Sequence, residues 1–272
     1  MAPAGARRGT RRRVTRYPAL SALRVGCVQY LNAKPLIHGY HGPVVFDHPS
    51  GLARDLAAGA LDVALVPVFE ALRHPRYLLA DGVAIASDGP VYSVFLAHRG
   101  PLAEIRSIAL DPASLTSVHL LQVLLAEYHG LRPQLLALAA FPDAADAVLL
   151  IGNQAIAFRE RDAGAHQLLD LGEEWRRCTG LPFVYAPWLL RADLPDAPAV
   201  ADELRALQRH GTARIGEIVR TDPHDPVLSE RYLTQHIRFG LGAREKAGIE
   251  KFRELLVRHG FIPASDGPLR YV

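Results

Sequence analysis

The chain has 272 residues, of which 49% are hydrophobic and 22% are charged, so its composition is that of a globular protein and not of a disordered one. No run of about 18 uncharged apolar residues occurs, and we therefore expect no segment that spans a membrane. Six arginines among the first 16 residues account for the net charge of +3; without them the remaining bases are fewer than the 28 acids, so we expect no nucleic-acid partner.

The arginine-rich start of the chain, residues 1–21, contains no acidic residue and is predicted to form a disordered basic tail. A secretory signal requires a continuous apolar segment after its basic part, and Pro18, Ser21 and Arg24 interrupt that segment here. We therefore expect the tail to remain uncleaved, with twin-arginine export as the alternative.

Short apolar runs alternate with a helical pattern in the first part of the chain. Ser50 can cap a helix that carries Leu52 and Leu56 on one face, and Gly59 permits a left-handed stop at its end. Strands are predicted at residues 24–28, 44–47, 63–66, 83–86 and 92–97. This alternation is typical of an α/β lobe with parallel crossovers.

A second, smaller α/β pattern begins after residues 99–101. A helix from about Thr116 to His129 places Val118, Leu121 and Leu125 on one face. Further strands are predicted at residues 107–110, 147–151 and 167–171. After residue 188 the pattern changes to helices at residues 198–220, 227–239 and 244–259, which we expect to pack on the first lobe.

The two patterns together predict an α/β fold with two lobes, a cleft between them and additional C-terminal helices. The first lobe is expected to contain residues 22–98 and 187–272, and the second lobe residues 99–186. Two segments, near residues 92–99 and 182–190, then cross between the lobes. This is the architecture of type II periplasmic binding proteins, in which the ligand lies in the cleft.

The first predicted strand leads into the segment V-Q-Y-L-N-A-K-P-L, residues 28–36, where polar Asn32 stands between a strand and a helix. In open α/β sheets, ligands bind at such strand ends. Asn32 has two interpretations at this point: its side chain caps the helix, or its amide faces a small anion. Pro35 suits an early helical position because its φ is fixed.

Further polar residues are expected at the same cleft. Ser93 begins a crossing segment, and Asn153 follows a predicted strand. Ser114, Thr116 and Ser117 lie at the start of a predicted helix, where free N–H groups and the positive end of the helix dipole suit a carboxylate. Structural interpretations stay open beside these, because such residues are also ordinary helix caps or polar strand residues. If they do face the cleft, its ligand should be a small anion.

Several common catalytic motifs are missing. His38, His41 and His48 lie near one another in sequence but do not form the H-x-x-x-H pattern of a zinc site. Neither the G-x-S-x-G nucleophile turn nor a glycine-rich phosphate loop occurs. Cys27 and Cys178 fit no metal or C-x-x-C pattern and are expected to be reduced, which favours a cytoplasmic protein. We expect neither a metal nor a cofactor.

Six segments of the chain are informative through their order. They read V-Q-Y-L-N-A-K-P-L (28–36), G-A-L-D-V-A-L-V-P-V-F-E (59–70), S-D-G-P-V-Y-S-V (87–94), D-P-A-S-L-T-S-V (111–118), I-G-N-Q-A (151–155) and T-G-L-P-F-V-Y-A-P-W (179–188). Together they resemble the chorismate dehydratase family, whose members act in the futalosine route of menaquinone biosynthesis. The resemblance extends from Leu23 to the C-terminus and implies the same two-lobed fold.

The resemblance implies a hydro-lyase that converts chorismate to 3-[(1-carboxyvinyl)oxy]benzoate and water without a cofactor. Asn32 and Ser93 would then be the catalytic residues, which orient a substrate carboxylate that itself takes the ring proton. The substrate-binding residues would be Ser114, Thr116, Ser117 and Asn153. The family more often has G-D-x-A at the segment of Asn153, so a role as a base is not carried over to the amide. Asn153 could equally accept backbone N–H groups at a helix start.

Two alternative functions remain from the sequence. The family of 1,4-dihydroxy-6-naphthoate synthase shares the fold and has S-P-C-P-N-D near its first helix, where this chain reads V-Q-Y-L-N-A-K-P-L, so the dehydratase is favoured. A non-catalytic binding protein for a small anionic metabolite is the other alternative, because a shared fold does not establish a function. Such proteins are usually exported. Both a monomer and a homodimer agree with the sequence.

Overall fold

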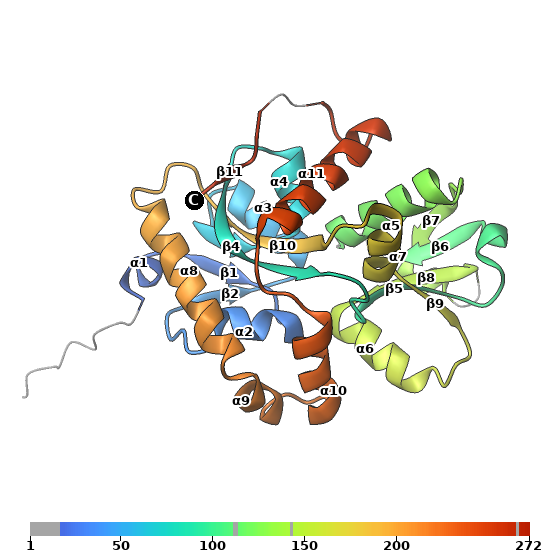
Figure 1. Ribbon diagram of the computed structural model, residues 1–272, viewed down its shortest axis with the longest axis horizontal. Helices are drawn as coiled ribbons and strands as arrows, with labels where there is room; N and C mark the ends of the chain where they lie inside the picture. Colours follow the sequence, from blue (N-terminus) through green and yellow to red (C-terminus); the bar gives the residue numbers. More distant parts are fainter. Residues whose placement is uncertain (1–16, 111–113, 142–143, 265–266) are drawn as a thin grey trace, which may run out of the picture.

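Two β-sheets lie side by side in the computed structural model, which describes residues 17–110, 114–141, 144–264 and 267–272 (Figure 1). The six-stranded sheet has the strand order β11-β4-β10-β3-β1-β2, and the five-stranded sheet has the order β7-β6-β8-β5-β9. Each sheet forms the centre of one lobe. The predicted α/β fold with two lobes is therefore confirmed.

The six-stranded sheet is built from short apolar strands near its centre. Its strands are β1 (Val25–Cys27), β2 (Val44–Phe46), β3 (Val63–Leu65), β4 (Leu78–Ser87), β10 (Phe183–Leu190) and β11 (Arg270–Tyr271). Strand β1 pairs in parallel with β2 and β3, whereas β10 runs antiparallel to β3 and β4. All three residues of β3 are fully buried, as is typical of a strand that is covered on both faces. The helices of this part are α1 (Pro18–Ser21), η1 (Leu31–Ala33), α2 (Lys34–Ile37), α3 (Pro49–Ala57) and α4 (Val68–Arg73).

The five-stranded sheet follows in the chain. Its strands are β5 (Val94–His98), β6 (Ser107–Leu110), β7 (Gln134–Ala137), β8 (Ala147–Ile151) and β9 (Gln167–Asp170). Strand β6 pairs in parallel with β7 and β8, and β5 runs antiparallel to β8 and β9. The helices of this part are η2 (Leu102–Glu104), α5 (Leu115–Tyr128), η3 (Leu138–Ala140), α6 (Gly152–Arg161) and α7 (Leu171–Thr179).

The two faces of the five-stranded sheet belong to different apolar clusters. On one face, Phe95 and Val148 pack with Ala155 of α6. On the other face, Leu96 and Leu149 belong to a larger cluster that includes α5 and continues into the six-stranded sheet. Successive side chains of a strand point to opposite faces of the sheet, so neighbouring residues belong to different clusters. The larger cluster connects the two lobes.

The segment after β10 returns to the first lobe, as expected. It contains α8 (Ala197–Thr212), α9 (Ile215–Arg220), α10 (Pro226–Arg231), the π-helical turn η4 (Tyr232–His236) and α11 (Ala243–Arg258). Helix α8 contacts β4 and α2, while α11 contacts both β10 and α5 of the second lobe. Two of the predicted helices are each divided in two. The helix predicted at residues 198–220 is interrupted at Arg214, whose dihedral angles are not helical, and the one predicted at residues 227–239 changes from the α-helix α10 to the π-helical turn η4.

The end of the predicted tail is part of the fold. Residues 1–16 lie outside the described part of the chain, but Pro18–Ser21 form α1. The N–H groups of Ala19 and Leu20 donate to the Glu203 carboxylate of α8 at 3.0 and 2.8 Å, which satisfies donors at the start of the helix. Leu20 is buried in the core. A disordered tail up to residue 21 was therefore wrong for its last residues, which have an apolar side chain to bury.

Other local predictions also needed correction. Helix α3 begins at Pro49 and not after a cap at Ser50; proline suits this first position because its φ is fixed. Strand β4 begins at Leu78, well before the predicted residues 83–86. The polar residue Asp81 and Gly82 interrupt its apolar pattern in the sequence, but Gly82 adopts a φ of +77° and lets the strand continue through this irregular point. Helices α4, α6 and α7 and strands β7 and β11 were not predicted.

The chain changes sheets at points that differ from the predicted lobe limits. Strand β5, expected in the first lobe, belongs to the five-stranded sheet, and the whole of β10 belongs to the six-stranded sheet. An apolar strand pattern does not indicate which sheet the strand joins, and this explains the difference. We propose that the lobes divide at residues 88–93 and 180–182.

Candidate functional site

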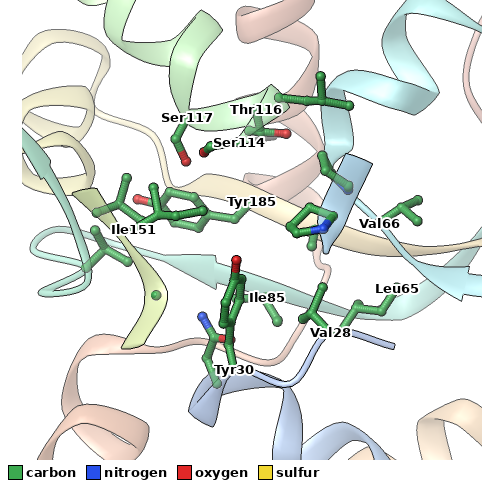
Figure 2. A pocket seen from close by; sticks show the side chains of 18 residues that line it. Val28, Tyr30, Leu65, Val66, Ile85, Ser114, Thr116, Ser117, Ile151 and Tyr185 are labelled. Carbon is green, nitrogen blue, oxygen red and sulfur yellow. The ribbon is translucent and has the colours of Figure 1, made fainter. Parts of the chain in front are cut away.

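A cavity lies between the two lobes, and both of them line it (Figure 2). It contains about 600 Å³ of empty space, including space that is open to solvent. The first lobe contributes the ends of β1 and β3 together with parts of β4 and β10, and the second contributes β5, the end of β8 and the start of α5. The carboxyl ends of parallel strands thus meet at the cavity, which is where α/β sheets bind ligands.

Most of the cavity wall is apolar. Val28, Leu65 and Val66 line it from the first lobe, and Val94 and Ile151 line it from the second. Because apolar walls bind carbon skeletons and a few polar groups fix their orientation, this wall suits a small carbon ring.

Two tyrosines that the sequence did not reveal complete the wall. Figure 2 shows Tyr30 extending into the space from one side, opposite the serines of α5, and Tyr185 lying between them. A Cβ atom at Gly152 would lie 3.0 Å from the Tyr30 ring, and the φ of Gly152 is +58°, so a side chain here would crowd Tyr30 and strain the backbone. Burial raises the pKa of Tyr185 well above its ordinary value, the Asp170 charge raises it further, and a hydrogen bond with Ser87 lowers it. Tyr185 therefore offers a neutral hydroxyl.

One polar end of the cavity, the hydroxyl pole, consists of Ser114, Thr116 and Ser117. All three residues are buried, and they stand at the start of α5, where the first N–H groups have no partner within the helix. Among the described residues, the hydroxyls of Ser114 and Ser117 have no hydrogen-bond partner, whereas the Thr116 hydroxyl accepts from the N–H of Phe69 at 3.2 Å. The structure thus brings these three predicted residues together at the cavity, and Ser114 does not cap α5 with its side chain.

The other polar end, the amide pole, is Asn32. The side chain lines the cavity, and its Oδ1 atom is buried without a hydrogen-bond partner among the described residues. Neither η1 nor α2 has a side-chain cap hydrogen bond, so the capping interpretation of Asn32 was wrong. Pro35 does lie at the start of α2, as predicted. A buried polar atom without a partner is uncommon in proteins, and a ligand in the cavity is one way to satisfy it.

Ser93 lies behind the cavity wall and not on it. It is fully buried, and its Oγ atom is 2.7 Å from the hydroxyl of Tyr232 in η4. Its carbonyl accepts from the N–H of Gly152 at 2.8 Å. Burial raises the pKa of Tyr232, and hydrogen bonds with Ser93 and then Asn32 lower it in part. Ser93 is therefore held against Tyr232, a residue that no sequence motif indicates.

Asn153 lies outside this cavity. Its Oδ1 atom accepts from the N–H of Leu31 at 3.2 Å and so joins α6 of the second lobe to η1 of the first. It lines a neighbouring, more polar hollow that shares Tyr30 and Ser114 with the cavity. This contact agrees with the structural interpretation of Asn153, in which its amide oxygen accepts a backbone N–H at the start of a helix.

A buried carboxylate fixes the segment that carries Ser93. Asp170 caps α7 through Gly172 and also accepts from the N–H groups of Val91 and Tyr92 at 3.0 and 2.7 Å. Tyr92 has a φ of +69°, a conformation that a residue other than glycine adopts only when the surrounding structure holds it. The crossing segment is thus held rigidly at the edge of the cavity.

Ionisable acids and bases are scarce around the cavity. Of the described residues on its wall, none is Asp, Glu, His, Lys or Arg. No three His, Cys, Asp or Glu side chains in the described part of the chain are grouped as a metal ion requires. Within the same residues, no helix is long and apolar enough to cross a membrane.

Comparisons with known proteins agree with this geometry. Residues 23–258 match a family model described as menaquinone biosynthesis. A chorismate dehydratase of Thermus thermophilus is 32% identical over 85% of this chain and 94% of its own length, and one of Campylobacter jejuni is 29% identical over 58% of each chain.

Solved structures show the same fold at low sequence identity. A crystal structure of an Archaeoglobus fulgidus protein has a TM-score of 0.69 and is 16% identical, covering 88% of this chain and 98% of that one. The periplasmic aliphatic sulphonate binding protein of Escherichia coli has a TM-score of 0.59 at 16% identity, covering 89% of this chain and 88% of that one. These likenesses show the fold alone. On the evidence of the family model and of the Thermus relative, the chain belongs to the menaquinone-biosynthesis family, with the fold of periplasmic binding proteins.

Proposed function

We propose that the protein is a chorismate dehydratase, a carbon–oxygen lyase that converts chorismate to 3-[(1-carboxyvinyl)oxy]benzoate and water in the futalosine route of menaquinone biosynthesis. The observation that carries the proposal is an apolar cavity between two neutral polar ends, in a chain that is 32% identical to the Thermus enzyme of that name. Chorismate has the matching shape, because it is a six-membered carbon ring with two carboxylates and a hydroxyl.

The cavity can bind such a dianion with neutral donors. At the hydroxyl pole, the Ser114 and Ser117 hydroxyls and the first N–H groups of α5 are placed to hold one carboxylate at the positive end of the helix dipole. The apolar wall then surrounds the ring, and Asn32 reaches its far side. Two lobes that close on the substrate would exclude water and fix the reacting groups.

The reaction needs a proton acceptor, and we propose that a carboxylate of the substrate serves. A ring C–H bond breaks and its proton goes to that carboxylate, while the electron pair of the bond completes the aromatic ring. The neighbouring C–O bond breaks with its electron pair on oxygen, and the departing hydroxide takes the abstracted proton back from the substrate's carboxyl group and leaves as water. Aromatisation supplies the driving force. The lack of an acid or base among the described wall residues supports this division of roles.

Asn32 is the chain's own catalytic group in this scheme. Its amide orients the reacting carboxylate and stabilises charge that develops as the proton moves. Ser93, for which the sequence suggested the same role, lies behind the wall, so we assign it a structural role through its contact with Tyr232.

The test is to incubate the purified protein, treated with a metal chelator, with chorismate and to follow the proton NMR spectrum. We expect one equivalent of 3-[(1-carboxyvinyl)oxy]benzoate for each chorismate consumed, and far slower formation of this product with the Asn32→Ala variant prepared in the same way. If chorismate stays intact although it raises the melting temperature, the protein is a binding protein and the proposal is wrong. A product formed equally by Asn32→Ala would point to a contaminating activity.

We also propose that the enzyme acts in the cytoplasm as a monomer or homodimer, without a nucleic-acid or membrane partner. Both cysteines are free thiols, and burial raises the pKa of Cys27 to about 12, which keeps this thiol protonated and unreactive. A reducing compartment suits such a chain. Light scattering of the purified protein distinguishes the two oligomeric states.

A further inference from the structure

The more polar hollow that adjoins the cavity is also the larger of the two spaces. It contains about 1110 Å³ of empty space, including space that is open to solvent, whereas the cavity contains about 600 Å³. Tyr30, Ser114 and Ile151 line both spaces, and Figure 2 shows Tyr30 and Ser114 on opposite sides of the cavity. The two spaces therefore meet at these three residues.

The rim of the hollow is exposed, whereas the wall of the cavity is largely buried. Gln29 and His48 of the first lobe and Gln154 of the second line the hollow and are exposed to solvent. The neighbours of Gln29 in the chain are Val28, which is buried, and Tyr30, which is half-buried, and both of them line the cavity. The hollow is therefore the solvent side of the combined space, and the cavity is its inner end.

The side chains on the rim suit the approach of a small anion. Gln29 and Gln154 carry amide N–H donors, and His48 carries an imidazole. Of the described residues that line the hollow, Asp47 is the only acid, and its Oδ2 atom lies 3.8 Å from the guanidinium of Arg54. An approaching carboxylate therefore meets hydrogen-bond donors, and the one acidic group beside them has a basic partner.

The two lobes are joined at other places around the cavity. On the α5 side, the ring of Phe69 in α4 stacks on His119 of α5, with centroids 3.6 Å apart, and the Phe69 N–H donates to Thr116 at 3.2 Å. At the crossing segment, Ser93 Oγ lies 2.7 Å from the hydroxyl of Tyr232. A ligand that entered on either of these sides would have to break buried contacts, whereas the hollow is already open.

We infer that the polar hollow is the entrance through which a small cyclic dicarboxylate reaches the cavity, and through which the product leaves. The amides of the rim replace part of the water around the carboxylates before the ring moves onto the apolar wall. The passage lies where Tyr30, Ser114 and Ile151 line both spaces. The inference rests on the proposed function for the identity of the ligand, whereas the route itself can be tested without that ligand.

The first test follows the entry of a small thiol reagent and needs no substrate. Ser117→Cys places a reporter thiol on the cavity wall, and Cys178→Ser removes the partly exposed native thiol. Cys27 is fully buried and stays protonated, so it does not compete. The protein is mixed with methyl methanethiosulfonate, and mass spectrometry gives the rate at which the reporter is modified.

The entrance is then narrowed with His48→Trp/Gln154→Trp, which adds one bulky ring to the rim from each lobe. The matched control is His74→Trp/Gln134→Trp, which changes the same residue types at exposed positions, one in each lobe, that line neither space. We expect the rim variant to slow modification of the reporter by about 10-fold and the control to leave the rate unchanged, because a closed access route limits entry. If the double rim variant is unstable, Gln154→Trp alone should slow modification in the same direction. Equal rates in the rim variant and the control would overturn the inference.

The second test uses the proposed ligand, without the reporter thiol. Surface plasmon resonance gives the association and dissociation rates of 3-[(1-carboxyvinyl)oxy]benzoate. Both rates should fall by the same factor in the rim variant, with Kd within about 2-fold of wild type, because an obstacle on the route changes neither end state. A higher Kd at an unchanged association rate would show that the rim belongs to the bound site, and the inference would be wrong. If modification is slowed but the wild-type protein does not bind the benzoate, the entrance stands and the proposed function fails.

Discussion

The hydroxyl pole and the amide pole of the cavity are built in different ways. The hydroxyl pole lies within four consecutive residues at the start of α5, and part of its binding capacity comes from backbone N–H groups, which only a proline substitution would remove. The amide pole depends on the side chain of Asn32 alone. A pole made of backbone groups should tolerate substitution, whereas a pole made of one side chain should not.

The far end of α5 explains why its start can stay without partners. Glu127 pairs with Arg258, the last residue of α11, and with His259, which follows it, and His129 lies 2.7 Å from Glu174 of α7. These charged contacts hold the helix by its C-terminal end. The N-terminal end can therefore keep unsatisfied donors for a ligand without loss of its position.

The largest effect is expected at the amide pole. Asn32→Ala should lower kcat for chorismate by about 100- to 1000-fold, the size seen when one donor to developing charge is removed. Steady-state kinetics with chorismate measures this. A turnover that survives even in the Asn32→Ala/Ser93→Ala double variant would contradict the assignment of both residues.

A smaller effect is expected where the hydroxyl pole touches the first lobe. Thr116→Val keeps the shape of the side chain but removes the acceptor for the buried N–H of Phe69. The free energy of unfolding should fall by about 1–3 kcal/mol, because a buried donor is left unsatisfied. Urea denaturation measures the change, with Ser114→Ala as the matched control that should retain its midpoint. Equal midpoints for the two variants would show that the contact is not made in solution.

Asn153 lies near the cavity but outside it, and a substitution there tests whether its role is structural or in substrate binding. Asn153→Ala removes the acceptor for the N–H of Leu31, and the free energy of unfolding should fall by about 1 kcal/mol with KM for chorismate unchanged. A large rise in KM at unchanged stability would favour the substrate-binding role that the sequence suggested.

The smallest effect is expected from a single hydroxyl of the hydroxyl pole. Ser117→Ala should raise KM for chorismate about 2- to 5-fold and leave kcat unchanged, because one neutral hydrogen bond is lost while the N–H groups of α5 remain. If Ser117→Ala lowers kcat as strongly as Asn32→Ala, the contrast between the two poles is wrong.

The sequence revealed those parts of the site that depend on neighbouring residues. The strands at residues 25–27 and 147–151 and the helix start at residues 114–117 follow from local patterns, so Asn32 and the hydroxyl pole were found. Tyr232 lies 139 residues from Ser93, and no period or motif connects them. Tyr30 and Tyr185 were missed for the same reason, since an aromatic residue next to a strand end does not indicate whether it faces a cavity. Asn153 was placed at the right edge of its sheet, but its contact with Leu31 depends on the other lobe.

The most direct test of the account is a crystal structure with 3-[(1-carboxyvinyl)oxy]benzoate bound. We expect the ring between the two sheets, one carboxylate on the first N–H groups of α5 with Ser117, and a polar group of the ligand on the amide of Asn32. A ligand found in the neighbouring hollow beside Asn153, or one whose carboxylates contact neither pole, would contradict the account.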